Sequence, residues 1–266
     1  MRYVFNDLDK LKRSLKDKYL FLFLDCDGTL TPIVDIPDKA IISGETKRLL
    51  YSLSQKKNCR IAIISGRGLA DIKKKVGLKN IIYSGNHGFQ IEGPKIKYEM
   101  AVPLGYKKIL ERIKIQLKEK LSGIKGVFVE DKKLSLALHF RLADRQQVTI
   151  VKTVFHESVI LYLVRNKIKI RPGKKILEVI PPVHWDKGKI VLWLLARQEA
   201  LSRSEKIIPI YIGDDTTDED AFKALKNRGL TVFVGHVDSS QAKYYVKNIK
   251  EVHELLKYIL DIQNIK

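Results

Sequence analysis

The sequence predicts an α/β protein in which a doubly wound parallel sheet carries an inserted, smaller α+β domain, and three observations support this fold. Several short apolar runs are continuous instead of alternating, which is typical of strands buried on both faces of a sheet. Helical patterns separate these runs, so the order along the chain is that of βαβ units. Between residues 102 and 180 the rhythm changes to longer helices and paired strands.

The strands of the predicted parallel sheet begin near the amino terminus and resume after the insert. They are expected at residues 19–24, 60–65, 81–84, 207–212 and 231–234, with helices at 43–57, 69–76, 187–201 and 218–228. In an open sheet of this kind, ligands bind at the carboxyl ends of the strands. Residues that directly follow a predicted strand are therefore the first candidates for a functional site.

The insert has its own order of elements. These are a helix at 105–121, strands at 127–130 and 134–139, a helix at 145–163, and strands on either side of Pro172 and Gly173. No low-complexity tract or long flexible linker sets the insert apart, which favours insertion into a loop over a domain on a tether. We therefore predict a core domain of residues 1–101 and 181–266 and an inserted cap domain of residues 102–180.

The composition indicates an ordinary globular protein with a basic surface. The chain has 266 residues, of which 45% are apolar and 30% charged, and a formal net charge of +20. Lysines occur in almost every segment, which favours a solvated surface over a specific nucleic-acid stripe. Cys26 and Cys59 form no CxxC pair, and no apolar run approaches the roughly 20 residues of a membrane helix. We expect a cytoplasmic protein with no disulfide, no membrane contact and no specific nucleic-acid partner.

Two aspartates follow the first predicted strand, in the segment Asp25-Cys26-Asp27-Gly28-Thr29. Side chains of an extended segment alternate, so Asp25 and Asp27 point to one side while Cys26 points into the core and packs there. Two carboxylates at the end of a buried strand repel each other and need a cation or a proton. Oxygen ligands of this kind suit Mg²⁺. The alternative is a turn rich in Asp and Gly, which is a common pattern.

A second acidic strand end weighs against that alternative. The predicted strand at 207–212 leads through a glycine into Asp214 and Asp215, and Asp218 follows three residues later. Capping of the next helix explains Asp218 but does not explain two carboxylates at the strand terminus. We therefore expect Asp214 to be a metal ligand, with Asp215 and Asp218 beside it.

Four segments, in order, resemble the motifs of haloacid dehalogenase phosphatases. They are DCDGT at 25–29, SGR at 65–67, the lysine that opens a helix at 187, and GDDTTDED at 213–220. The resemblance implies a haloacid dehalogenase-like core with a nucleophile at Asp25, a general acid and base at Asp27, and phosphate ligands at Ser65 and Lys187. It also implies Mg²⁺ held by Asp25, the backbone carbonyl of Asp27, and Asp214.

The residue types suit these roles. Lys187 lies in the first turn of a predicted helix, where the helix dipole disfavours a cation, so a bound anion explains it better than a surface position does. Asp27 has to protonate the leaving oxygen and later take a proton from water, and we expect the neighbouring carboxylates to raise its pKa.

A finer similarity, to the trehalose-phosphatases, lies in longer segments. These are DGTLTPIV at 27–34, GNHG at 85–88, HFR at 139–141, RPGKKILEVIPP at 171–182, WDKGKIV at 185–191 and IGDDTTDEDAF at 212–222. The family usually carries arginine before the proline in an ExRP segment, whereas this chain reads Glu178-Val179-Ile180-Pro181. An insert between the second and third motifs resembles the C2-type cap of the sugar-phosphate branch. Together these resemblances imply trehalose 6-phosphate as the substrate.

A disaccharide phosphate needs several donors and acceptors close together. The candidates for substrate binding are Gly66, Arg67, Asn86, His87, Glu130, Arg171, Lys174 and Glu178. For Glu130 and Lys174 a plain surface position explains the residue equally well. Glu178 is flanked by apolar residues in a predicted strand, which favours a buried carboxylate that faces the catalytic edge and accepts bonds from sugar hydroxyls.

Other interpretations stay open at this point. Within the same class are sucrose 6-phosphate phosphatase, mannosyl-3-phosphoglycerate phosphatase and a phosphosugar mutase. From another class, a basic binding protein could have kept the scaffold, but a binding protein has no need of Asp25, Asp27, Lys187 and Asp214 together. A trehalose-6-phosphate synthase partner is also left open by the resemblance.

Overall fold

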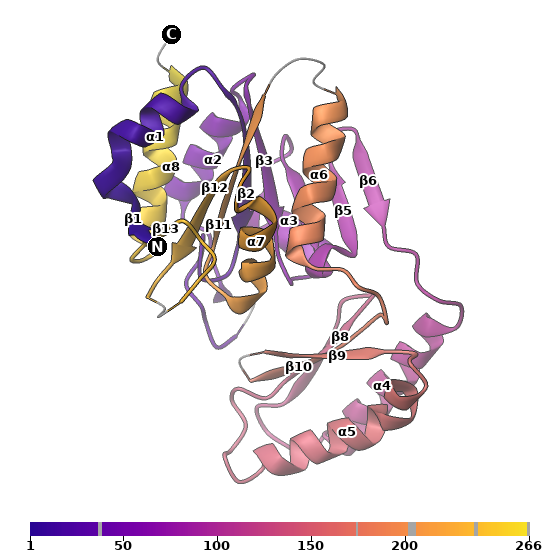
Figure 1. The fold of residues 1–266 in the computed structure, drawn as a ribbon. Helices are drawn as coiled ribbons and strands as arrows, with labels where there is room; N and C mark the ends of the chain where they lie inside the picture. The colour runs from indigo at the N-terminus through magenta and orange to yellow at the C-terminus, as the bar shows by residue number, and fades with distance from the viewer. Residues whose placement is uncertain (37–38, 174, 202–205, 237–238, 265–266) are drawn as a thin grey trace. The chain divides into compact units, whose positions relative to one another are not determined.

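The structure is a computed structural model of the 266-residue chain. It describes residues 1–36, 39–173, 175–201, 206–236 and 239–264. Two compact units appear in Figure 1: a core unit, Met1–Tyr98 with Trp185–Lys266, and a cap unit, Glu99–His184. The junctions expected from the sequence were 101/102 and 180/181.

Among the described residues, a largely parallel sheet of nine strands forms the centre of the core unit, in the order β1-β13-β12-β11-β2-β3-β4-β5-β6. The strands are β1 (Arg2–Tyr3), β2 (Tyr19–Asp25), β3 (Cys59–Ile64), β4 (Ile82–Gly85), β5 (Gln90–Gly93), β6 (Ile96–Glu99), β11 (Ile207–Gly213), β12 (Leu230–Val234) and β13 (Tyr244–Val246). The strands predicted to be parallel are parallel in the structure, namely β2, β3, β4, β11 and β12. The short strands β1 and β13 continue the parallel part, whereas at the other edge β5 runs antiparallel to β4. The reason is the short connection between these strands, because a parallel pair needs a crossover of a dozen or more residues.

The central strand β2 is buried on both faces, as its continuous apolar run predicts. Leu20, Leu22 and Leu24 belong to one hydrophobic cluster, and Phe21 and Phe23 belong to the cluster on the opposite face. This alternation is the period of two of a β-strand. Helices cover both faces of the sheet (Figure 1), so the doubly wound architecture is confirmed.

The helices divide between the two faces of the sheet. Residues of α1 (Leu8–Leu15), α2 (Gly44–Ser54), α3 (Leu69–Val76) and α8 (Ile249–Asn264) contribute to the first cluster. Residues of α6 (Lys187–Leu201) and α7 (Glu219–Leu225) contribute to the second. Short 3-10 helices occupy Val4–Asp7 (η1), Asn86–Gly88 (η3) and Thr216–Asp218 (η4). Within the described ranges, no helix combines the length and the apolar character needed to cross a membrane.

The cap unit is an α+β layer with one antiparallel sheet, in the order β7-β8-β10-β9. Its elements are α4 (Tyr106–Lys120), β7 (Phe128–Asp131), β8 (Leu136–His139), α5 (Val148–Val164), β9 (Lys169–Gly173) and β10 (Ile176–Ile180). Leu136, Leu138 and Val179 pack with residues of α4 and α5 in one hydrophobic cluster. Strand alternation therefore places Glu130, Ala137, Glu178 and Arg171, which lie opposite one another across the four strands, on the other face of this sheet.

Candidate active site

The candidate site lies in the core unit, at the edge of the sheet where the parallel strands end. β2 ends at Asp25, Ser65 follows β3, and Asp214 follows β11. Lys187 is the first residue of α6 and is 6% exposed. Because the parallel strands run in one direction, residues that are far apart in the sequence come to one edge of the sheet.

Lys187 bridges two buried aspartates. Its Nζ donates to Oδ1 of Asp25 at 2.7 Å and to Oδ1 of Asp218 at 2.6 Å. Burial alone would lower the pKa of Lys187, but the charges of Asp218 and Asp25 and their hydrogen bonds outweigh burial and raise that pKa above its ordinary value. The protein's own carboxylates therefore hold a cation in the first turn of a helix, against the helix dipole.

Asp218 is fully buried and accepts four hydrogen bonds. Its Oδ1 accepts from Lys187 Nζ and from the Tyr211 hydroxyl, both at 2.6 Å. Its Oδ2 accepts from the backbone amides of Asp214 at 3.1 Å and Asp215 at 2.9 Å. Asp218 thus fixes the loop after β11 and the side chain of Lys187 together, which is more than the helix capping that its sequence position suggests.

Tyr211 is a residue of this site that sequence reasoning missed. It is fully buried in β11, and its ring packs edge-on against Phe222 with centroids 5.6 Å apart. Burial, followed by the charges of Asp218 and Asp25, raises the pKa of Tyr211 well above its usual value, so its hydroxyl stays a donor. The sequence could have indicated Tyr211, because it is a tyrosine inside an apolar strand and a buried phenol hydroxyl needs a hydrogen-bond partner.

Asp25 is 6% exposed, and its environment disfavours the charged form. Burial raises the pKa of Asp25; Lys187 lowers it, and the charges of Asp218 and Asp214 raise it further, so the pKa ends well above its ordinary value. Cys26 is fully buried within the hydrophobic cluster of the leucine face of β2, where burial raises the pKa of its thiol. A buried, protonated thiol packs and does not act as a nucleophile.

The acidic residues of this edge fit a hard cation. One carboxylate oxygen from each of Asp25, Asp214 and Asp218 lies within 4.8 Å of the others. Gly28 has φ +89°, and the Asp214 carboxylate occupies the space that a Cβ at Gly28 would need. The loop after β2 therefore has to carry glycine for Asp214 to reach this position. Carboxylate oxygens of this kind are ligands for Mg²⁺ or Ca²⁺ rather than for a soft metal.

Asp215 has a different task from its neighbour Asp214. Its Oδ1 accepts the backbone amide of Thr216, and it forms a reciprocal capping box with Asp218 at the start of η4. Its carboxylate is not part of the three-residue acidic group found among the described residues. Asp215 therefore shapes the loop that presents Asp214.

The segment Ser65–Arg67 is braced by residues that follow β4. The amide of Asn86 donates to the carbonyl of Arg67 at 2.6 Å, and the amide of His87 donates to the carbonyl of Ser65 at 3.1 Å. Both Asn86 and His87 have φ +54°, a conformation that is uncommon for residues other than glycine. The ring of His87 lies against Gly66, where a Cβ would come within 2.6 Å of Cε1. The loops after β3 and β4 therefore support each other, and they carry four residues predicted for substrate binding: Gly66, Arg67, Asn86 and His87.

Arg67 binds two aspartates. Its Nε donates to Oδ2 of Asp27 and its Nη2 donates to Oδ1 of Asp27, each at 2.7 Å. Its Nη1 donates to Oδ2 of Asp71 at 2.9 Å. Arg67 was expected to bind substrate, and the structure instead places its guanidinium on the side chain of the predicted general acid and base.

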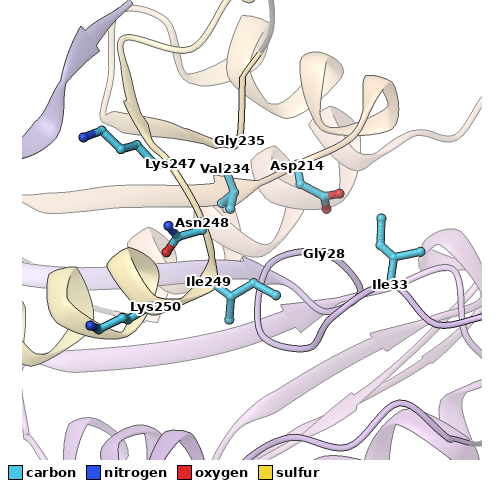
Figure 2. Close-up of a pocket in the computed structure, with 9 residues that line it drawn as sticks. All are labelled: Gly28, Ile33, Asp214, Val234, Gly235, Lys247, Asn248, Ile249 and Lys250. Carbon is cyan, nitrogen blue, oxygen red and sulfur yellow. The ribbon is translucent and has the colours of Figure 1, made fainter.

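A pocket of about 480 Å³ opens beside the acidic group, and Figure 2 shows the residues that line it. Asp214 and Ile33 lie toward one side of it, and Lys247, Asn248 and Lys250 lie toward the other. Its volume is within the range of small-molecule sites. Because Asp214 and Gly28 belong to its lining, this pocket is part of the candidate site.

Glu130 lies in the cap unit and belongs to a cluster on the sheet. Its Oε2 is 2.8 Å from Nε2 of His139, whose ring stacks on Phe128 with centroids 4.3 Å apart. Burial alone would raise the pKa of Glu130, but the hydrogen bond to His139 and the charge of Lys132 lower it below its ordinary value. Glu130 is therefore a carboxylate held by contacts with its neighbours on the cap sheet, and not a solvated surface charge.

Glu178 is 4% exposed and is paired inside the cap unit. Its Oε1 accepts from Lys132 Nζ at 2.9 Å and from the Ser135 hydroxyl at 2.8 Å. Sequence reasoning missed Lys132, which is buried with its partner and is the first residue of the loop between β7 and β8. Arg171 lies directly opposite Glu178 across β9 and β10. The expectation for Lys174 lies outside the described residues.

Comparisons with known proteins agree with the sequence resemblance. The family model described as Trehalose-phosphatase matches residues 23–252. Trehalose-phosphate phosphatase B of Arabidopsis thaliana is 33% identical over 96% of this chain and 70% of its own length. Trehalose-phosphate phosphatase of Mycobacterium tuberculosis is 36% identical over 82% of this chain, which spans 54% of that relative. The chain therefore covers about half the length of the mycobacterial relative.

Solved structures show the same fold. The C-terminal domain of the Candida albicans trehalose-6-phosphate phosphatase matches with a TM-score of 0.77 and 28% identity, over 96% of this chain and 95% of that one. A haloacid dehalogenase-like hydrolase from Bacteroides thetaiotaomicron matches with a TM-score of 0.64 and 18% identity, over 91% of this chain and 100% of that one. At 18% identity the second likeness concerns the fold alone.

Proposed function

The chain belongs to the trehalose-phosphatase family, and from this premise we propose that it hydrolyses trehalose 6-phosphate to trehalose and inorganic phosphate. The observation that carries the proposal is the buried group in which Lys187 bridges Asp25 and Asp218 beside Asp214. All of these residues lie within the segment that the family model matches.

The proposed reaction has two displacements at phosphorus. In the first, a carboxylate oxygen of Asp25 forms a bond to phosphorus, the bond from phosphorus to the sugar oxygen breaks, and Asp27 gives its proton to that oxygen. In the second, water attacks the aspartyl phosphate, Asp27 takes a proton from the water, and phosphate leaves with Asp25 restored. Lys187 and the Ser65 hydroxyl stabilise the charge on the phosphoryl oxygens.

The family implies a divalent cation, and we propose Mg²⁺ held by Asp25, Asp214 and the backbone carbonyl of Asp27. When bound, it neutralises the charge that would otherwise keep a carboxylate away from a phosphate dianion. Asp215 and Asp218 support this set through the backbone of the loop after β11.

For the sugar we propose contacts from Glu130, Arg171 and Glu178 of the cap unit, and we add Lys132 because it is paired with Glu178. The phosphate side includes Gly66, Asn86 and His87 through the braced loop. A cytoplasmic location and a trehalose-6-phosphate synthase partner remain predictions.

Phosphate release from a panel of sugar phosphates tests the proposal. The panel contains trehalose 6-phosphate, sucrose 6-phosphate, mannosyl-3-phosphoglycerate and glucose 6-phosphate, each with Mg²⁺. We expect the highest kcat/KM for trehalose 6-phosphate. A higher kcat/KM for another ester would reassign the substrate within the class. Loss of all activity at about 200 mM salt, together with strong retention of DNA, would support the basic binding protein instead.

Replacing Asp214 with alanine is expected to raise the Mg²⁺ concentration needed for half-maximal activity by at least about tenfold, because the variant loses a hard oxygen ligand. Calorimetric titration of Mg²⁺ gives a second readout that does not depend on turnover. Asp215→Asn is the matched comparison, because the Asp215 side chain caps Thr216, and we expect a much smaller change. Equal effects in the two variants would place the metal ligand elsewhere.

Replacing Glu178 with glutamine should lower kcat/KM for trehalose 6-phosphate about ten- to a hundredfold, which corresponds to roughly 1.5 to 3 kcal/mol for a lost charged acceptor. Hydrolysis of p-nitrophenyl phosphate should change little, since a small ester does not use remote binding energy. Glu111→Gln, which removes an exposed charge from α4 of the same unit, is the control. An equal loss on both esters would mean that Glu178 supports the fold.

A further inference from the structure

The guanidinium of Arg67 joins α3 to the loop after β2 inside the core unit. Two of its nitrogens, Nε and Nη2, contact the two carboxylate oxygens of Asp27 at 2.7 Å, which is the fork geometry of a bidentate pair. The third nitrogen, Nη1, contacts Asp71 at 2.9 Å. The side chain of Arg67 is 10% exposed and that of Asp27 is 36% exposed, so the guanidinium is the buried side of this pair.

The other end of Arg67 is also fixed. Its backbone amide donates to the Ser65 hydroxyl at 3.1 Å, and its carbonyl accepts the amide of Asn86. Asp71 lies in the first turn of α3, four residues after Arg67, and its side chain is 32% exposed. An arginine held at its backbone and on both sides of its guanidinium has little freedom to swing toward a ligand.

We infer that Asp71 and Arg67 are positioning residues for Asp27, and that Arg67 does not bind the substrate phosphate. The inference rests on the proposed phosphatase function and assigns a task within that site. Asp71 orients Arg67, and Arg67 orients the carboxyl group that exchanges a proton with the leaving oxygen. Asp71 stands outside every segment that carried the sequence resemblance.

The physical reason lies in the demands of proton transfer. A general acid has to sit at hydrogen-bonding distance from the leaving oxygen in one orientation, and misplacement by about 1 Å costs roughly a hundredfold. An ester whose leaving group departs without a proton does not need this help.

The leaving-group dependence of kcat/KM therefore tests the inference, because kcat/KM reports the step in which the leaving group departs. Asp71→Asn and Arg67→Lys are measured on trehalose 6-phosphate, whose leaving group is an alcohol, and on p-nitrophenyl phosphate, whose leaving group is a stable phenolate. On the sugar phosphate we expect kcat/KM to fall about tenfold for Asp71→Asn and roughly a hundredfold for Arg67→Lys. On p-nitrophenyl phosphate we expect less than about a threefold change.

Glu45→Ala is the matched control for Asp71. Glu45 is likewise an acidic residue in the first turn of a helix, in this case α2, and its carboxylate pairs with His253 away from the site. We expect it to leave the ratio of the two kcat/KM values unchanged. Melting temperatures of all variants separate a loss of fold from a loss of positioning.

Two outcomes would overturn the inference. An equal fall on both esters, in step with the melting temperature, would make Arg67 and Asp71 structural. A higher KM for every phosphate ester, together with weaker inhibition by inorganic phosphate, would return Arg67 to substrate binding. If the wild-type protein prefers another sugar phosphate, that ester takes the place of trehalose 6-phosphate, so a failure of the proposed substrate is seen before any variant is measured.

Discussion

Replacing Asp25 with asparagine is expected to lower kcat by at least about 10⁴-fold, because an amide cannot attack phosphorus and form the aspartyl phosphate. The exchange also removes one hard oxygen from the cation site. Asp218, its neighbour in the buried group, is not free to replace it, since four donors hold the Asp218 carboxylate.

The same exchange should leave the core unit folded. Burial and the charges of Asp218 and Asp214 act against a negative charge on Asp25. A neutral amide of the same shape avoids that cost, and Lys187 keeps Asp218 as a partner. We therefore expect the melting temperature without metal to be equal to that of the wild type or higher.

Phosphate release and thermal unfolding monitored by circular dichroism measure the two effects separately. Asp261→Asn, at an exposed position on α8, controls for a carboxyl-to-amide change outside the site. Activity within about tenfold of the wild type would remove Asp25 from the role of nucleophile.

The sequence was informative where one local pattern determines one structural feature. The continuous apolar run of β2 predicts burial on both faces, and the leucines and phenylalanines do separate onto two faces. The order of strands and helices predicts a doubly wound α/β fold, and the resemblance of four motifs implies a haloacid dehalogenase-like core; the likeness to solved structures confirms this fold. Asp25, Asp214 and Lys187 were found because each lies at the end of a strand or opens a helix.

The sequence did not predict hydrogen-bond partners that come together only through the packing of distant elements. Nothing local links Tyr211 or Lys187 to Asp218, because their contact arises only when β11 and α6 pack together. Arg67 was a candidate for substrate binding, and the partners that it has, Asp27 and Asp71, depend on the packing of α3.

The end of the core sheet formed by β1 and β13 was missed for a related reason. Strands β1 and β13 have only two and three residues, which is too short for a periodic signal. They pair with each other although they lie far apart in the sequence. Helix α8 closes the same region by packing on α1 and α2, and the Tyr258 hydroxyl donates to the carbonyl of Leu8 at 2.9 Å.

Replacing Asp218 with alanine is expected to destabilise the core unit by about 3 to 5 kcal/mol, because it removes one partner from a buried ion pair. The change leaves the Tyr211 hydroxyl and the amides of Asp214 and Asp215 without their acceptor. At about 2 to 4 °C per kcal/mol for a unit of this size, the melting temperature should fall by about 6 to 20 °C.

Urea unfolding of a double-mutant cycle with Tyr211→Phe separates the parts of this loss. Removing the Tyr211 hydroxyl alone should cost about 0.5 to 1.5 kcal/mol, as for one hydrogen bond. In the double variant the two losses should not add, because both remove the bond between Tyr211 and Asp218. Asp218→Asn keeps the shape of the side chain, and its amide oxygen still accepts hydrogen bonds. Its loss of unfolding free energy should therefore be smaller than that of Asp218→Ala. Losses that add fully, or a cost below about 1 kcal/mol for Asp218→Ala, would mean that this network does not hold the loop of Asp214 in place.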